Sequence, residues 1–345
     1  MANAGRTAVD FIDSDAYGVA GTSAAARNRG PSSVVGPGDP GVKIRMGGHS
    51  LVHSYRSSPR LFAKSRERRK AGQTVTSELN GASALREAAE RTAALLRKVP
   101  DASLKVPGLA WTVGETAAHL VSDAKDLTGC VTGELDASER PAGDGATTTA
   151  TQRTAVANAQ QLDELPERDP SRLADMLVPA TDDFIAAAAR HTSDEPVLAT
   201  NGVSMTVPTM TSVLLGEQLI HGLDIARAAN LPWQITREDA LRVIAGVIAM
   251  VPDYVDRAQA AGRHISYELR FRGGPRYRLA IDDGTATVTE PGPKVDCRIA
   301  ADPVAFLLIG YGRVGQWGPI LRGQILAYGR KPWLGLTFAR LITGP

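Results

Sequence analysis

Cysteine and long apolar runs are both scarce in this 345-residue chain. The two cysteines, Cys130 and Cys297, stand far apart, so neither a disulfide framework nor a cysteine-rich zinc site can be built from them. No uninterrupted apolar run reaches the ~20 residues that a membrane-spanning helix requires. The first thirty residues also lack a basic start followed by an apolar run, which is the pattern of a secretory signal. We therefore expect a cytoplasmic protein with reduced thiols and no membrane span.

Acidic residues are scarce in one region, residues 1–74, which hold 12 Lys/Arg against 5 Asp/Glu, whereas the remainder holds 27 against 32. The larger part is thus mildly acidic, which disfavours a nucleic-acid-binding core, because phosphate neutralisation needs clustered positive charge on a folded face. Residues 1–74 are rich in Gly, Ser, Ala and Arg and show no helical or strand period. This composition predicts a disordered basic N-terminal extension, with a nucleic-acid or membrane-surface arm as the alternative.

Residues 75–235 have the apolar spacing of a bundle of four main helices. The T-x-x-E pattern of Thr112 and Glu115 is a capping box, and it predicts the start of a helix that reaches about Val131. Asn201-Gly202 between two short β-like runs predicts a hairpin. A nearly all-apolar helix follows over about 207–229, as is typical of a buried helix.

Residues 236–345 predict a smaller α+β domain, so the chain as a whole belongs to the α+β class. A helical pattern over about 237–260 gives way to alternating apolar and polar residues from Ile265 onward, which predict strands. Helices are expected at Pro303–Tyr311 and at about 333–342, with a short strand near Ile325–Tyr328. We also expect the four tryptophans to pack in cores, because large aromatic side chains dominate protein interiors; they are Trp111, Trp233, Trp317 and Trp333.

Glu217 and His221 are four residues apart on the apolar helix, so they share one face and can hold one ion between them. A carboxylate and an imidazole in such a helix are costly unless something satisfies them. His119 on the earlier helix supplies a third ligand. Two imidazoles and one carboxylate are a common catalytic set for zinc with one position left open, although nickel, iron and manganese accept the same set. A hydrogen-bonded core histidine is the plainer alternative.

Two segments resemble the signatures of the mycothiol-dependent maleylpyruvate isomerase family: residues 111–120, which read WTVGETAAHL, and residues 217–228, which read EQLIHGLDIARA. The strands from Ile265 onward and the segments 302–313 and 321–329 are similar to the sterol-carrier-like C-terminal domain of that family. The resemblance covers residues 75–345 and implies that residues 75–235 form a DinB-like four-helix bundle. It also implies that His119, Glu217 and His221 hold a divalent metal, usually zinc. Glu115 departs from the pattern of many relatives, which have an aspartate before the histidine.

The resemblance further implies the chemistry. A metal-activated thiol of mycothiol would add to the cis double bond of a maleyl-type acid, allow rotation and then be eliminated. The alternatives are a mycothiol S-transferase that acts on electrophiles, or a non-catalytic metal- or lipid-binding protein. Arg313 resembles an arginine implicated in binding the acidic substrate, with compensation of a helix dipole as the alternative. Asp224 is expected either to orient a ligand imidazole or to pair with Arg227.

Overall fold

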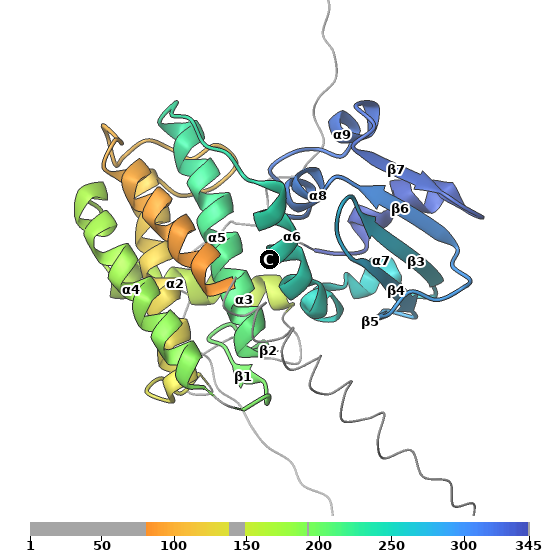
Figure 1. Cartoon of the computed structure of the whole chain (residues 1–345), viewed down its shortest axis with the longest axis horizontal. Helices are drawn as coiled ribbons and strands as arrows, with labels where there is room; N and C mark the ends of the chain where they lie inside the picture. The colour runs from red at the N-terminus through yellow and green to blue at the C-terminus, as the bar shows by residue number, and fades with distance from the viewer. Residues whose placement is uncertain (1–80, 138–148, 192, 344–345) are drawn as a thin grey trace, which may run out of the picture. The chain divides into compact units, whose positions relative to one another are not determined.

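The computed structural model describes residues 81–137, 149–191 and 193–343, which belong to one compact unit, Gln73–Pro345. The predicted extension over residues 1–74 lies outside the described residues. The unit combines a group of long helices with a five-stranded sheet (Figure 1), so the predicted α+β class is confirmed.

The helical part contains a helix that ends at residue 96, followed by α2 (Val113–Thr132), α3 (Ala150–Glu164), α4 (Pro170–Arg190) and α5 (Val207–Ala228). Helix α2 begins with the predicted capping box: the Thr112 side chain accepts from the Glu115 amide, and the Glu115 carboxylate accepts from the Thr112 amide at 2.7 Å. Gly133 ends this helix with a φ of 76°, which is a left-handed conformation that favours glycine. Helix α2 packs against both α4 and α5, so their facing side chains meet inside the bundle.

A hairpin leads into α5. Strands β1 (Val197–Leu198) and β2 (Ser204–Met205) pair antiparallel, and Gly202 in the connecting turn has a φ of 72°. The predicted Asn201-Gly202 turn is therefore confirmed. Thr206 caps α5, whose first turn contains Pro208, a position where the missing N–H costs nothing.

Gly222 lets the segment that follows α5 pack closely against that helix. A Cβ atom at this position would lie 2.2 Å from the Trp233 ring, so only glycine leaves room for the indole. The Trp233 indole N–H also donates to the Leu219 carbonyl at 3.0 Å. This close packing lies one residue beyond His221 and restrains that part of the helix.

The predicted single helix over 237–260 is wrong, because three shorter helices occupy it: α6 (Arg237–Val247), the 3-10 helix η2 (Ile248–Tyr254) and α7 (Arg257–Ala260). Pro252 lies within η2 and cannot donate a helical hydrogen bond. Helix α6 packs against α5 on one side and α8 (Pro303–Gly310) on the other. The boundary at residues 235/236 between a bundle and a second domain stays a prediction.

The sheet has the strand order β5-β4-β3-β6-β7, in which β3 and β6 run parallel and the other neighbours antiparallel. One face is apolar, since Tyr267 and Phe271 of β3 contact Phe338 and Phe306. The strands are β3 (His264–Phe271), β4 (Arg276–Asp282), β5 (Thr285–Thr289), β6 (Cys297–Ala301) and β7 (Ile325–Tyr328).

The end of the chain folds into short helices: α9 (Trp317–Leu321), η3 (Pro332–Leu336) and η4 (Phe338–Arg340). The predicted helix over 333–342 is therefore wrong, since 3-10 turns take its place. Among the residues that the structure describes, no helix is both long enough and apolar enough to cross a membrane.

Candidate metal centre

His119 of α2 meets Glu217 and His221 of α5 between the two packed helices. One ligand atom from each residue lies within 4.8 Å of the other two. Glu217 Oε2 is 3.5 Å from His119 Nε2 and 3.1 Å from His221 Nε2. Both histidines are buried, at 3% and 7% exposure. The arrangement brings together the three residues that the sequence predicted as ligands.

The other ring nitrogen of His221 is bound within the same helix. Its Nδ1 lies 3.1 Å from Asp224 Oδ2, and because a carboxylate only accepts, Nδ1 carries the proton. Asp224 is 2% exposed. Arg313, which follows α8, donates to it through Nη2 at 2.6 Å and through Nε at 3.1 Å. A chain of charged groups thus runs from His221 through Asp224 to the C-terminal part of the unit.

His119 is held by a residue that the sequence reasoning missed. Its Nδ1 lies 2.8 Å from Oε1 of Gln161, on α3. An amide oxygen only accepts, so Nδ1 again carries the proton. Gln161 is 1% exposed, and its amide nitrogen donates to Asp126 Oδ2 at 3.0 Å. No local pattern marks Gln161, because it is 42 residues from His119 in sequence.

Trp111 forms a wall beside both imidazoles. The centroid of its ring is 5.0 Å from that of His119 and 6.1 Å from that of His221. Its position follows from the capping box, since Thr112 starts α2 directly after it. Trp111 is partly buried, and its packing partners include the two predicted ligands.

The charges of the site are mutually dependent. Burial opposes ionisation of Glu217, but hydrogen bonds from His119 and His221 outweigh it and hold the pKa of this carboxyl well below its ordinary range. Burial likewise lowers the pKa of His221, but Asp224 and Glu217 outweigh it and raise that pKa to about 9. The Asp224 pKa is lowered, because its bonds to His221 and Arg313 outweigh burial. A cation that binds here must displace the proton on His221 Nε2.

The donor set fits a divalent metal such as zinc. Both Nδ1–H groups bond outward, so each imidazole directs Nε2 toward Glu217, and a neutral imidazole offers its lone pair there. Nitrogen and carboxylate donors in a ratio of two to one suit zinc with an open fourth position. Binding of a metal by these three residues stays a prediction.

Arg313 and Asp224, the two residues predicted to assist catalysis, contact each other. The third guanidinium nitrogen of Arg313, Nη1, donates to the Tyr311 carbonyl at 2.6 Å, so all three nitrogens are hydrogen-bonded. Its contact with an acidic substrate stays a prediction. The expected pairing of Asp224 with Arg227 is replaced by the pair with Arg313, while Arg227 donates to the Arg313 carbonyl at 3.4 Å.

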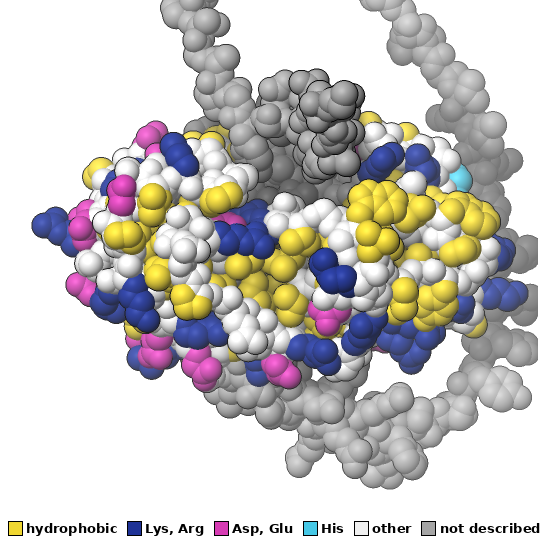
Figure 2. All heavy atoms as spheres, turned by 90° about the horizontal axis from the view of Figure 1, so that it is seen from above, with side chains coloured by type: hydrophobic (Ala, Val, Ile, Leu, Met, Phe, Trp, Pro, Cys, Tyr) yellow, Lys and Arg dark blue, Asp and Glu magenta, His cyan; other side chains and the backbone are white. Residues whose placement is uncertain are grey.

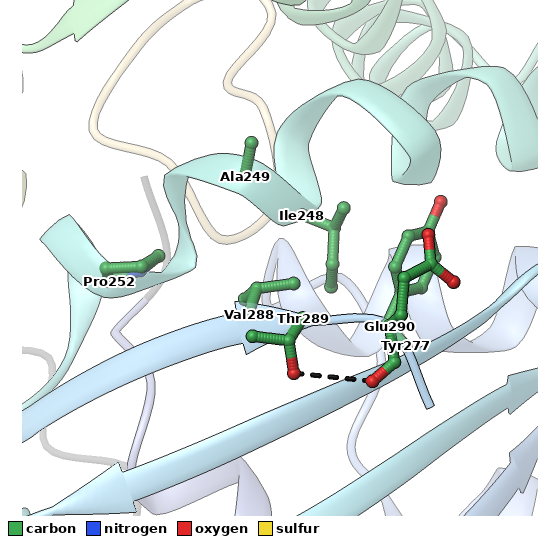
Figure 3. Close-up of a pocket in the computed structure, with 7 residues that line it drawn as sticks. All are labelled: Ile248, Ala249, Pro252, Tyr277, Val288, Thr289 and Glu290. Atoms are coloured by element: carbon green, nitrogen blue, oxygen red, sulfur yellow. Dashed lines mark hydrogen bonds between the residues drawn. The ribbon is translucent and has the colours of Figure 1, made fainter. Parts of the chain in front are cut away.

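A separate cavity of about 370 Å³ lies between η2 and the strands β4 and β5 (Figure 3). Its walls contain one carboxylate, Glu290, and no histidine or cysteine, so they do not supply a metal site. The remaining lining residues are Ile248, Ala249, Pro252, Tyr277, Val288 and Thr289.

Residues 85–226 match the family described as "Mycothiol maleylpyruvate isomerase N-terminal domain". This range contains the three predicted ligands together with Gln161 and Asp224. Among curated proteins, no sequence matched this chain.

Three solved structures show weaker likeness. The mycothiol-dependent maleylpyruvate isomerase is 15% identical, with 72% of this chain and 91% of that chain covered and a TM-score of 0.42. A histidine-to-alanine mutant of that isomerase is 14% identical over 72% and 92%, with a TM-score of 0.44. A sec-alkylsulfatase from Pseudomonas sp. is 17% identical over 56% and 30%, with a TM-score of 0.28.

Proposed function

We propose that this chain, whose residues 85–226 belong to the mycothiol maleylpyruvate isomerase N-terminal domain family, is a mycothiol-dependent metalloenzyme that isomerises a maleyl-type acid from cis to trans. The observation that carries the proposal is the orientation of the two imidazoles. Each is bonded outward through Nδ1 and directs Nε2 to Glu217, which is the arrangement that ligands of a catalytic metal need.

His119, Glu217 and His221 would hold the ion, with zinc as the first choice. A divalent cation in this position favours the thiolate form of a thiol at neutral pH, and the family suggests mycothiol as that thiol. A thiolate is the nucleophile that reversible addition to a conjugated double bond requires.

The surrounding residues hold the ligands in place. Gln161 fixes the proton of His119 on Nδ1, and Asp224 does the same for His221. Arg313 balances the buried charge of Asp224 and holds its carboxylate by two nitrogens. The Trp111 ring shields the imidazoles from water on one side.

Metal analysis tests the site. We expect about one equivalent of a divalent metal per purified chain, and a loss of that equivalent in His119→Ala. The matched control is His264→Ala, because His264 is an exposed residue on β3 whose partner is Asp282. Wild-type protein without stoichiometric metal, combined with unchanged stability of His119→Ala, would contradict the proposal and leave a non-catalytic metal- or lipid-binding role.

A thiol-dependent assay tests the reaction. Mycothiol and maleylpyruvate are supplied to the metal-loaded chain, and parallel reactions replace maleylpyruvate with a bimane or a chloro-nitroaromatic compound. We expect turnover of maleylpyruvate that requires mycothiol and is absent from His119→Ala. Conjugation of the electrophiles without any turnover of maleylpyruvate would instead assign the chain as a mycothiol S-transferase.

A further inference from the structure

Six of the eight exposed large hydrophobic side chains in the described residues lie between positions 317 and 336. Trp317 and Trp333 are 59% and 61% exposed, and Leu321 is 86% exposed. The prediction that all four tryptophans pack in cores is therefore wrong for these two. Large apolar side chains that gather on a surface mark an interaction site more often than single ones do.

The exposed side chains come from elements that adjoin one another. Trp317 and Leu321 are four residues apart on α9 and so share a face. The Gln316 side chain at the start of α9 donates to the Leu336 carbonyl of η3 at 3.4 Å. We call Trp317, Leu321, Trp333 and Leu336 the aromatic patch. Strand β7, at the sheet edge, contacts both α9 and η3 and adds the exposed Leu326 and Tyr328.

The surroundings of this patch are positively charged. Residues 303–345 contain no Asp or Glu and five cationic residues: Arg313, Arg322, Arg330, Lys331 and Arg340. Arg313 belongs to the metal centre. Arg330 and Lys331 share the single carboxylate of Asp296, which leaves an excess of positive charge. Figure 2 shows hydrophobic side chains gathered over the C-terminal part of the unit with Lys and Arg side chains beside them.

We propose that the aromatic patch docks the protein onto the surface of an anionic phospholipid bilayer. Tryptophan favours the boundary between water and hydrocarbon, and leucine gains from burial in the acyl region. The cations around the patch complement the headgroups, and each Lys or Arg near such a surface strengthens binding roughly fivefold. The contact is peripheral and independent of the proposed metal chemistry.

Other occupants fit these observations less well. A second copy of the chain would bring two cationic surfaces together, which costs free energy through like-charge repulsion. Strand β7 has four residues and so offers few backbone hydrogen bonds to a partner strand. A nucleic acid would satisfy the cations and stack on the tryptophans, but it would leave the exposed leucines without an apolar environment.

Vesicle binding tests the proposal with the full chain. Vesicles of phosphatidylcholine alone are compared with vesicles that also contain phosphatidylglycerol, and bound protein is measured by co-sedimentation. The test variant is Trp317→Gln combined with Trp333→Gln. The matched control is Leu198→Gln, because Leu198 lies on the β1–β2 hairpin and is 37% exposed. Circular dichroism and metal content check that the fold of each variant is intact.

We expect the wild type to bind the anionic vesicles and to bind them more weakly at high salt. The vesicle affinity should fall at least about tenfold in the double variant and stay unchanged in the control. All variants keep the basic residues 1–74, so binding that persists undiminished in the double variant would assign it to another region and overturn the proposal. Three other results would also overturn it: no binding of the wild type to anionic vesicles, concentration-dependent dimers that the double substitution abolishes, or binding to single-stranded nucleic acid without binding to vesicles.

Discussion

His119 and His221 present the same ring nitrogen to Glu217 but are held in different ways. The support for His119 is a neutral amide, Gln161, which is itself held by Asp126. The support for His221 is a carboxylate, Asp224, which is neutralised by Arg313. Both supports fix the same tautomer, but only a carboxylate also raises the basicity of the imidazole it holds. Gln161 thus orients its imidazole only, whereas Asp224 both orients its imidazole and places a negative charge beside it. We call these the neutral side and the charged side of the site.

Glu217→Ala removes the ligand that both sides share and should have the largest effect. Without its carboxylate, two buried imidazoles face each other with no anion between them. We expect loss of stoichiometric metal, measured by elemental analysis after gel filtration. Retention of a full equivalent would show that the two histidines and other groups suffice.

Asp224→Asn tests the charged side. The asparagine oxygen can still accept from His221 Nδ1, but the negative charge is lost and the Arg313 guanidinium is left buried without its partner. We expect metal affinity to fall about 10- to 100-fold, as is typical for a partner of a metal-bound histidine. The free energy of unfolding should also fall by about 3 kcal/mol, because half of a largely buried ion pair has been removed. Chelator competition and thermal denaturation measure the two effects, and unchanged affinity would contradict the charge role.

Gln161→Leu tests the neutral side. The substitution keeps the approximate volume but removes the acceptor of His119 Nδ1–H and the donor to Asp126. We expect a fall in metal affinity of about tenfold, the lower end of the same range, because no charge is lost. NMR of the His119 ring nitrogens provides a second measurement: the Nδ1–H form should dominate in the wild type and lose its preference in the variant. An unchanged ring spectrum would mean that Gln161 only fills space.

Arg313→Gln should have the smallest effect on the metal, because it acts on His221 only through Asp224. We expect less than a tenfold loss in affinity. Arg227→Gln is the matched control, since Arg227 lies one turn beyond Asp224 and donates to the Arg313 carbonyl. Equal losses in the two variants would contradict a specific role of the Arg313–Asp224 pair. A selective rise in the substrate KM of Arg313→Gln would favour direct contact with an acidic substrate.

The sequence by itself determined those parts of the site that rest on neighbouring residues. Glu217 and His221 share a helical face because they are four residues apart, and Thr112 with Glu115 specified where α2 begins. The apolar and alternating patterns likewise predicted the α+β class. Such features depend on local periodicity and hydrogen bonding, which a short stretch of chain carries by itself.

Only the tertiary structure decided which residues complete the site and which remain on the surface. Gln161 reaches His119 across 42 residues of sequence, and Arg313 reaches Asp224 across 89. Trp233 is partly buried and packs against Gly222, whereas Trp317 and Trp333, of the same residue type, are exposed. Neither helical period nor composition contains this information, because contacts between distant segments and the burial of each side chain depend on how the helices and the sheet pack together.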